Sequence, residues 1–110
     1  MKFRVIITRS AEADADNIYE WLNKQSHIGA SNWWKAFLKA IDSLRGNAGS
    51  FGRAAESREG VEALHELSFK TRHGRSYRLL FTIRGDIVYA LRVRSTGQAL
   101  LTSDEIEFPE

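Results

Sequence analysis

The segment that most constrains the fold of this 110-residue chain is FKTRHGRSYRLLFTIRGDIVYALRVRS, residues 69–95. Apolar side chains occupy alternate positions on both sides of Gly85-Asp86, and a period of two is typical of strands that bury one face. The sequence therefore predicts a β-hairpin. The positions that we expect to face a common core are Tyr77, Leu79, Phe81 and Ile83 before the turn, and Ile87, Tyr89, Leu91 and Val93 after it.

The length of the turn decides which residues pair across this hairpin. A two-residue loop would place Leu79 opposite Arg92 and mix an apolar with a charged face. A three-residue loop over residues 84–86 keeps the faces apart, and we expect Gly85 or Asp86 to take the left-handed conformation in it. The other face then carries Arg78, Leu80, Thr82, Val88, Ala90, Arg92 and Arg94.

The arginines of that second face suggest an anionic partner. In the three-residue register Arg78 lies opposite Arg92, and like charges directly opposite one another destabilise a sheet. Either a bound anion or carboxylates of the same chain would relieve this repulsion, and the sequence leaves both alternatives open. Together with Arg94, these side chains form a modest phosphate-binding signal.

Charge is unevenly distributed along the chain. The net charge is +2, but residues 98–110 hold four acids and no base, so the preceding residues carry +6. Between Lys70 and Arg94 there are seven lysines and arginines and one acid. Such a concentrated basic segment favours nucleic acid or an acidic protein as the partner over a small neutral substrate.

Composition excludes several classes of protein. Hydrophobic residues make up 43% and charged residues 27%, as in one globular domain. The absence of cysteine excludes disulfide and thiol chemistry and suits a reducing compartment, so we expect a cytoplasmic protein. No apolar run has membrane-spanning length, and the N-terminus lacks a signal-peptide pattern. The three histidines are too scattered to predict a metal site, and no cofactor is expected.

Two helices are predicted in the first half of the chain. Ser10 is a good N-cap for a helix over residues 11–25, and Ser31 for a second helix that ends near Gly46. Trp34 and Leu38 lie beside the apolar stripe of the second helix. They predict either a broad core contact or a docking surface for another protein.

The remaining segments complete an α+β fold of order β-α-α-β-β-β. Residues 2–8 predict a first strand, residues 47–60 a glycine-rich loop that includes Gly60, and residues 61–70 a second strand. We expect a helical hairpin packed on one face of a small, mainly antiparallel sheet, with the arginine face left open. The C-terminal end of the chain is expected to fray.

The order of these elements, with Tyr77-Arg78-Leu79-Leu80-Phe81, Ile83-Arg84-Gly85-Asp86 and Leu91-Arg92-Val93-Arg94, resembles the RelE/ParE superfamily of bacterial type II toxin–antitoxin toxins. The resemblance covers residues 2–97. It implies a toxin domain at 1–97, followed by an acidic C-terminal tail at 98–110. It also implies a growth-inhibiting protein that is neutralised by a cognate antitoxin.

The resemblance implies two classes of target. RelE-like members cleave mRNA on the ribosome, which requires a group that takes the 2′-OH proton and cations beside the phosphate. ParE-like members bind and inhibit DNA gyrase. Here Arg78 matches one RelE arginine, but Glu66 and Ser68 replace two lysines, and Leu100-Leu101-Thr102 stands where a catalytic tyrosine is expected. A ParE-like binding toxin is therefore the first interpretation.

Two alternatives to this interpretation stay open. One is a ribosome-dependent endoribonuclease with Arg78, Arg92 and Glu66 as catalytic residues and His73 as a further candidate. In that constellation Glu66 is equally well explained as a counter-charge for either arginine. The other is a degenerate, non-toxic binding member, because two basic positions of many relatives are lost at Ser95 and near Gln98.

The resemblance also implies the binding surfaces. An anionic target or antitoxin segment would contact the basic side chains, and an apolar antitoxin segment would dock on Trp34 and Leu38. The expected partners are the antitoxin and either DNA gyrase or the ribosome with mRNA, with no membrane, as a homodimer or a toxin–antitoxin hetero-oligomer. The acidic tail is expected near the arginines. The predicted anion-binding residues are Arg72, Arg75, Arg78, Arg92 and Arg94.

Overall fold

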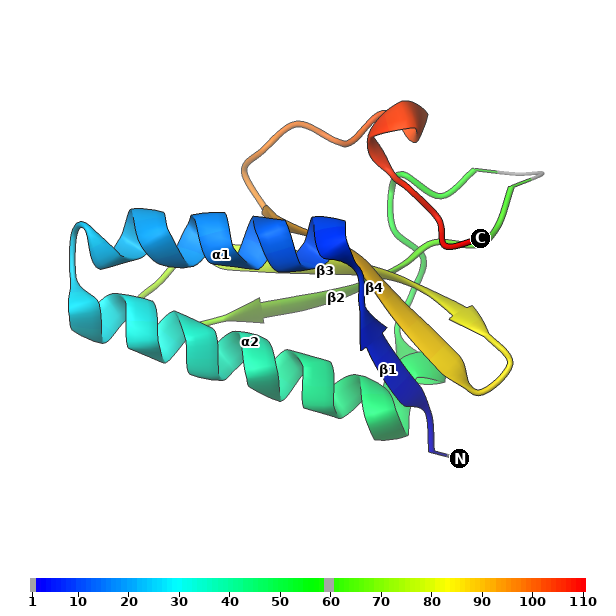
Figure 1. The fold of residues 1–110 in the computed structure, drawn as a ribbon, viewed down its shortest axis with the longest axis horizontal. Coiled ribbons are helices and arrows are strands. Elements are labelled where there is room, and N and C mark those ends of the chain that lie inside the picture. The colour runs from blue at the N-terminus through cyan, green and yellow to red at the C-terminus, as the bar shows by residue number, and fades with distance from the viewer. Residues whose placement is uncertain (1, 59–60) are drawn as a thin grey trace.

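A four-stranded sheet with a two-helix hairpin on one face forms the framework of the protein (Figure 1). The computed structural model describes residues 2–58 and 61–110. The sheet order is β1-β4-β3-β2, in which β1 runs parallel to β4 and the other pairs are antiparallel. The elements are β1 (Arg4–Ile7), α1 (Arg9–Asn23), α2 (His27–Asn47), β2 (His65–Lys70), β3 (Ser76–Arg84) and β4 (Ile87–Ser95), with short 3₁₀ helices η1 (Ala48–Ser50) and η2 (Ser103–Glu105). The predicted α+β fold and β-α-α-β-β-β order are confirmed.

Both helices begin earlier than predicted. The Thr8 side chain accepts a hydrogen bond from the Ala11 N–H at 3.3 Å, so Thr8 and not Ser10 caps α1. Thr8 is fixed there because its own N–H donates to the Ala90 carbonyl of β4 at 3.0 Å. Ser26 caps α2 in the same way through the Gly29 N–H at 3.0 Å, which leaves Ser31 inside the helix.

The loop between α2 and β2 also differs in part from the prediction. Gly46 lies within α2, and η1 follows the helix directly. β2 begins at His65 and not at Val61. The predicted loop residue Gly60 lies outside the described residues.

The main core lies between the helices and the sheet. Trp33, Phe37 and Leu44 of α2 are at most 2% exposed, and the Trp33 and Phe37 rings stack with centroids 5.5 Å apart. The core side chains from the sheet include Leu67, Tyr77, Leu79, Phe81, Val88, Ala90 and Val93. The predicted helix-facing side of β3 is therefore confirmed. Burial of large apolar side chains of this kind stabilises a fold by about 1.5–3 kcal/mol each.

The β3–β4 turn has two residues, so the predicted three-residue loop is wrong. Arg84 pairs with Ile87 around Gly85-Asp86, and Gly85 has a φ of 61°, the left-handed value expected of a tight hairpin. A register shift between Leu80 and Phe81 follows: Phe81 pairs with Ala90, and Leu80 with Arg92. One extra residue of β4 is thus accommodated in a β-bulge.

Because of this bulge, the alternation of side chains between the two sheet faces shifts by one residue within β4. Val88 and Ala90 before it and Val93 after it belong to the core under the helices, whereas Tyr89 and Leu91 belong to a second cluster on the opposite side. The prediction that Tyr89, Leu91 and Val93 share one face is therefore wrong. The bulge also places Arg78 opposite Arg94 and not opposite Arg92.

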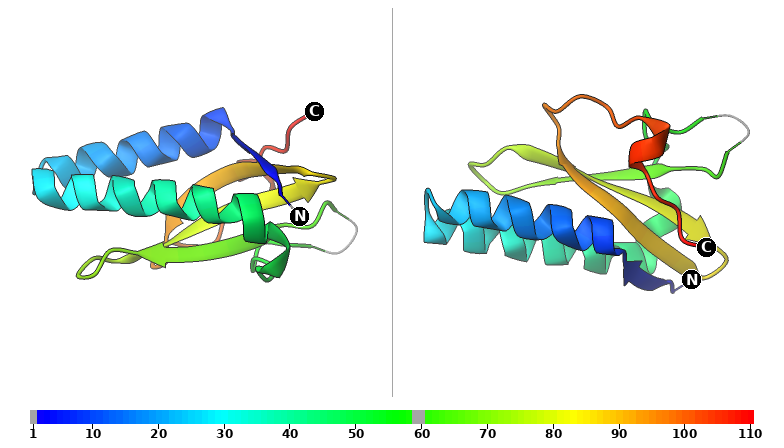
Figure 2. Two further views of the ribbon diagram at one scale, coloured as in Figure 1. Left: turned by 90° about the horizontal axis from the view of Figure 1, so that it is seen from below. Right: turned by 45° about the horizontal axis from the view of Figure 1, so that its top comes forward.

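The sheet face away from the helices is covered, so the predicted open arginine face is wrong. The C-terminal segment lies beside the loop that precedes β2 (Figure 2). Leu101 is 4% and Ile106 8% exposed, so the segment before Pro109, where fraying was predicted, packs against the sheet. The buried residues of this second cluster are Ala54, Leu64, Leu80, Leu91, Leu101 and Ile106. The sheet face that was predicted to be open and basic is therefore covered by a second, smaller hydrophobic core.

Candidate functional site

The side chain of Arg78 is buried between two carboxylates. Its Nε donates a hydrogen bond to Glu66 Oε1 at 2.8 Å, and its Nη1 donates to Glu56 Oε2 at 3.0 Å. Nη2 also donates to Glu56, which gives a bidentate ion pair. Glu56 accepts a further hydrogen bond from the Leu101 N–H at 3.2 Å, so one buried carboxylate joins β3 to the C-terminal segment.

The charges of this cluster stabilise one another. Burial by itself raises the pKa of Glu56, but the hydrogen bonds from Arg78 and from the Leu101 N–H outweigh burial and lower that pKa below its ordinary value of 4.5. The hydrogen bond to Glu56, followed by the one to Glu66, raises the pKa of Arg78. Both groups therefore remain charged at neutral pH, as a buried bidentate pair requires.

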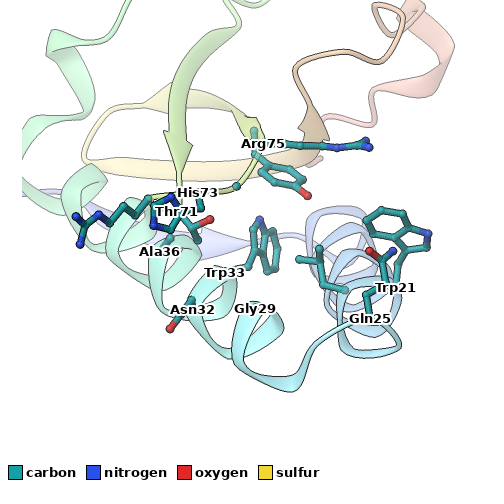
Figure 3. A pocket seen from close by; sticks show the side chains of 13 residues that line it. Trp21, Gln25, Gly29, Asn32, Trp33, Ala36, Thr71, His73 and Arg75 are labelled. Atoms are coloured by element: carbon teal, nitrogen blue, oxygen red, sulfur yellow. The ribbon is translucent and has the colours of Figure 1, made fainter.

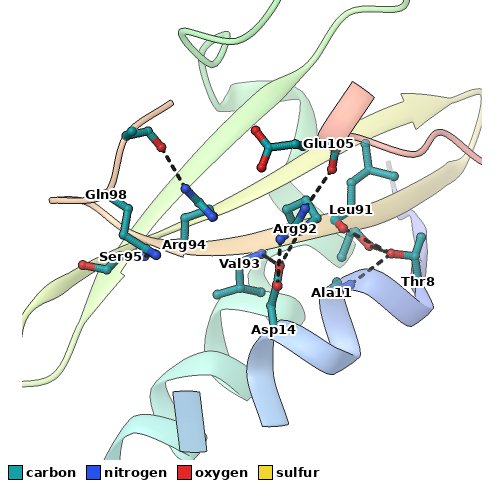
Figure 4. Close-up of polar contacts among 12 residues, drawn as sticks. Thr8, Ala11, Asp14, Leu91, Arg92, Val93, Arg94, Ser95, Gln98 and Glu105 are labelled. Carbon is teal, nitrogen blue, oxygen red and sulfur yellow. Dashed lines mark hydrogen bonds and ion pairs between the residues drawn. The ribbon is translucent and has the colours of Figure 1, made fainter. Parts of the chain in front are cut away.

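Arg92 is held by a third carboxylate, Asp14, at the junction of α1 and β4 (Figure 4). Its Nε and Nη2 donate to the two Asp14 oxygens at 2.7 and 3.0 Å. The Val93 N–H donates to Asp14 Oδ2 at 2.9 Å, and Arg92 Nη1 donates to the Glu105 carbonyl at 2.8 Å. The hydrogen bond to Asp14 is the main cause of the raised pKa of Arg92. The proposed catalytic set is thus brought together only in part, because Glu66 contacts Arg78 while Arg92 is paired elsewhere.

The acidic tail does lie near the arginines, as predicted, but it contacts them mainly through its backbone. Arg94 Nη2 donates to the Ala99 carbonyl at 2.8 Å, next to the Arg92 contact with Glu105 (Figure 4). The carboxylate partners Glu56 of Arg78 and Asp14 of Arg92 were not predicted from the sequence. Asp14 suits a helix start, and Glu56 lies in a loop without periodicity, so no local signal marked either as a counter-charge.

Arg72 and Arg75 have a different environment, because both are exposed on the turn between β2 and β3. The Gly74 N–H donates to the Thr71 carbonyl at 3.2 Å, and a Cβ on Gly74 would lie 2.1 Å from Thr71 Oγ1, so a larger residue at this position would require the Thr71 side chain to rotate. The Arg75 guanidinium lies 5.6 Å from the centroid of the Trp21 ring, a cation–π contact. Within residues 2–58 and 61–110, neither arginine forms an ion pair.

A cavity of about 550 Å³ separates this turn from the helical hairpin (Figure 3). Its volume is within the range of pockets that bind ligands. Burial raises the pKa of Tyr77 in its wall, which keeps that phenol neutral at physiological pH. The lining residues include Trp21, Leu22, Trp33, Ala36, His73 and Tyr77.

Leu38 lies on the outer surface of the helical hairpin, whereas Trp34 is half-buried and packs against the main core, as the predicted broad core contact requires. The Trp34 ring packs edge-on against Tyr19 of α1, with centroids 5.7 Å apart, and both line a hollow of about 390 Å³. Leu38, one helical turn further along α2, is 47% exposed. The structure therefore places the two predicted docking residues on adjacent turns of one helix, and their docking role stays a prediction.

Neither a metal cluster nor a membrane-spanning helix is found in the described part of the chain. No three His, Asp or Glu side chains there are placed to hold a metal ion. Although α2 has 21 residues, no helix in residues 2–58 and 61–110 is both long and apolar enough to cross a bilayer.

Comparisons with known proteins identify the family and support the fold. The family model described as "ParE toxin of type II toxin-antitoxin system, parDE" matches residues 5–100. A solved structure titled "Chromosomal ParDE TA system from P. aeruginosa" aligns with a TM-score of 0.64 and 19% sequence identity, over 86% of this chain and 96% of the other, and thus has the same fold. The comparison with curated proteins gives no match. Because the family model matches most of its length, the chain belongs to the ParE toxin family of type II toxin–antitoxin systems, within the RelE/ParE superfamily.

Proposed function

We propose that this protein arrests bacterial growth by binding DNA gyrase and that a cognate ParD-type antitoxin neutralises it. The observation that carries the proposal is the family match over residues 5–100. The ion pairs of Arg78 and Arg92 with carboxylates of their own chain support the same conclusion. A toxin that acts by binding needs a stable surface, whereas a nuclease needs cationic side chains that are free to contact a phosphate.

The nuclease alternative is less well supported by the described geometry. Arg78 is 5% exposed and uses Nε, Nη1 and Nη2 for two carboxylates of its own chain. Glu66 is engaged as one of these counter-charges. A nuclease mechanism at this position would require that the ion pairs open and that the overlying C-terminal segment move. We therefore assign Arg78, Glu66 and Glu56 a structural role.

The target is tested by two assays on the purified protein. We expect inhibition of supercoiling by DNA gyrase and no cleavage of mRNA on programmed ribosomes. The toxin bound to its antitoxin serves as the control, in which gyrase activity should return. Cleavage of ribosome-bound mRNA with unaffected gyrase would overturn the proposal in favour of the endoribonuclease. Failure in both assays, together with normal growth on expression, would favour the non-toxic binding member.

We further propose that the antitoxin docks on the surface formed by Trp34 and Leu38. Trp34 is held in place by Tyr19, so its ring is a preorganised apolar contact. Leu38 is a large apolar side chain that is half-exposed on the same helix. Asp16 and Lys35 border the hollow beside Trp34 and supply a polar rim.

Replacement of Leu38 by alanine is expected to weaken antitoxin binding about tenfold, or about 1.4 kcal/mol, because an apolar contact is lost from the interface. Titration calorimetry with the purified antitoxin measures this change. The matched control is Ile28→Ala, which removes a 76% exposed side chain at the N-terminal end of the same helix and should change the affinity less than about twofold. Equal affinities of wild type and Leu38→Ala would contradict docking at this surface.

A further inference from the structure

Trp21 is the most exposed aromatic residue in the described part of the chain. It lies in the last turn of α1 and is 49% exposed, whereas Trp33 is buried and Trp34 half-buried. A single exposed apolar side chain needs no explanation by itself, so the neighbours of the ring decide what it can bind.

The Arg75 guanidinium is the nearest charged neighbour of this ring. Its Cζ lies 5.6 Å from the ring centroid, and Figure 3 shows the side chain extending from the β2–β3 turn above the indole. A guanidinium that stacks by its face keeps its N–H donors at the edge, where they match the oxygens of a phosphate. The cation–π contact therefore orients Arg75 without using its donors.

The turn keeps its positive charge, unlike the sheet beside it. Carboxylates of the same chain neutralise Arg78 and Arg92, but within residues 2–58 and 61–110 neither Arg72 nor Arg75 forms an ion pair. No aspartate or glutamate is among the described residues that line the two hollows bordered by Trp21 and Arg75. An anionic ligand is thus complementary to this surface.

The second of these hollows, of about 390 Å³, adds neutral polar groups to the ring and the cation. It lies between α1 and the end of β4, and its lining includes Asn17, Ser95 and Gln98. The Ser95 N–H donates to Gln98 Oε1 at 2.9 Å, which fixes this side chain and leaves its amide N–H groups as donors. Side-chain amides of this kind hydrogen-bond the edges of nucleobases.

We propose that Trp21 and the β2–β3 turn form a binding site for single-stranded nucleic acid. A base stacks on the exposed indole, and Asn17 or Gln98 hydrogen-bonds its edge. Phosphates on either side of that base pair with Arg72 and Arg75. Sites for single strands combine aromatic platforms and cationic side chains in this way. The bases of a duplex are already stacked on one another, so an unpaired base is favoured.

The site is tested by nuclear magnetic resonance, in which the indole N–H of Trp21 gives its own signal. The probe is a thymidine oligonucleotide of about ten nucleotides, a length within the range that single-strand sites cover. We expect it to shift the Trp21 indole signal and the amide signals of residues 71–75. It should bind at least about fivefold more tightly than a DNA duplex of the same length, although the duplex carries more charge.

Variants separate stacking from charge. Trp21→Ala should weaken binding of the oligonucleotide at least about fivefold, whereas Trp21→Phe, which keeps an aromatic ring, should retain most of the affinity. Arg72→Ala/Arg75→Ala should reduce the slope of log affinity against log salt concentration by about 1.4, because each phosphate contact to a single strand contributes about 0.7. The control Arg45→Ala/Arg53→Ala removes the same charge from exposed arginines outside both hollows and should leave the slope unchanged.

A uridine oligonucleotide of the same length distinguishes RNA from DNA as the source of the strand. Tighter binding of either one identifies that source, and equal binding indicates a site that contacts base and phosphate but not the sugar.

Four results would overturn the proposal. They are an unshifted Trp21 signal, equal affinity of wild type and Trp21→Ala, equal salt slopes of the two double-arginine variants, or binding of a decaglutamate peptide as tight as that of the oligonucleotide. The last result would assign the surface to an acidic protein. Because neither gyrase nor antitoxin is present in these titrations, their outcome does not depend on the proposed function.

Discussion

Replacement of Arg78 by alanine is expected to lower the free energy of unfolding by about 3–5 kcal/mol, because it leaves a buried carboxylate without its partner. The side chains of Arg78 and Glu56 are only 6% and 1% exposed, so water cannot replace the lost hydrogen bonds. Glu66 would lose its partner as well. Denaturant unfolding followed by circular dichroism measures the change.

The control for this variant is an ion pair on the surface. Arg45 pairs with Asp42 at 2.7 Å, but their side chains are 56% and 73% exposed. Arg45→Ala should therefore change the free energy of unfolding by less than about 1 kcal/mol. Similar effects of the two variants would contradict a structural role for Arg78. The expected instability also means that a loss of toxicity in Arg78→Ala is no proof of target contact unless the variant is shown to be folded.

The pH dependence of stability provides a second measurement on the same cluster. Because the pKa of Glu56 is lower in the folded state than its ordinary value of 4.5, its contribution is complete above pH 4.5 and is lost as the pH falls through the folded-state pKa. Glu56→Gln, which cannot ionise, should abolish this part of the acid-induced loss. An unchanged slope of stability against pH below 4.5 in Glu56→Gln would contradict the assignment.

Replacement of Leu101 by alanine is expected to lower the free energy of unfolding by about 2–4 kcal/mol, through lost apolar burial and the cavity left behind. Leu101 is 4% exposed and packs in the second cluster with Leu80 and Leu91 of the sheet. Its N–H also donates to Glu56, so the segment is fixed by side chain and backbone together. Thermal or denaturant unfolding of the full-length variant measures the effect.

The neighbouring residue supplies a matched control for Leu101. Leu100 has the same side chain but is 56% exposed, and Leu100→Ala should change stability by less than about 0.5 kcal/mol. If Leu101→Ala were equally neutral, residues 98–110 would be an appendage to a domain that ends at residue 97. The expected difference between the two leucines would instead make the C-terminal segment part of one folding unit, as we propose.

A period of two in the sequence predicted the sheet face of the side chains correctly in β3 but not in β4. The pattern of Tyr77, Leu79 and Phe81 predicted correctly which side of β3 faces the helices. The same reasoning failed for Tyr89 and Leu91 in β4, because the bulge beside Leu80 and Phe81 changes the face within one strand. Since apolar residues occupy both faces of β4, alternation alone could not locate the extra residue.

The prediction of the site residues was also limited by contacts that local sequence patterns do not reveal. Arg72 and Arg75 were expected to be available for binding, and their turn is exposed and borders the cavity beside the helical hairpin. Arg78 was given the same role from the sequence, but it is enclosed by Glu56, which lies 22 positions away in the chain. Ion pairs between distant segments leave no local pattern, so the sequence could not separate a binding arginine from a buried structural one.

The order of the strands and helices and the helical hairpin could be predicted from the amino-acid sequence, because these features follow from periodicity within short segments. The sequence also showed the resemblance to the RelE/ParE superfamily, which the family model that matches residues 5–100 supports. The two-residue turn, the bulge, the covering of the second sheet face and the partners of Arg78 and Arg92 became known only from the folded structure. The physical reason is that these features depend on contacts between segments far apart in the chain, where burial and charge neutralisation are settled jointly and outweigh local preference.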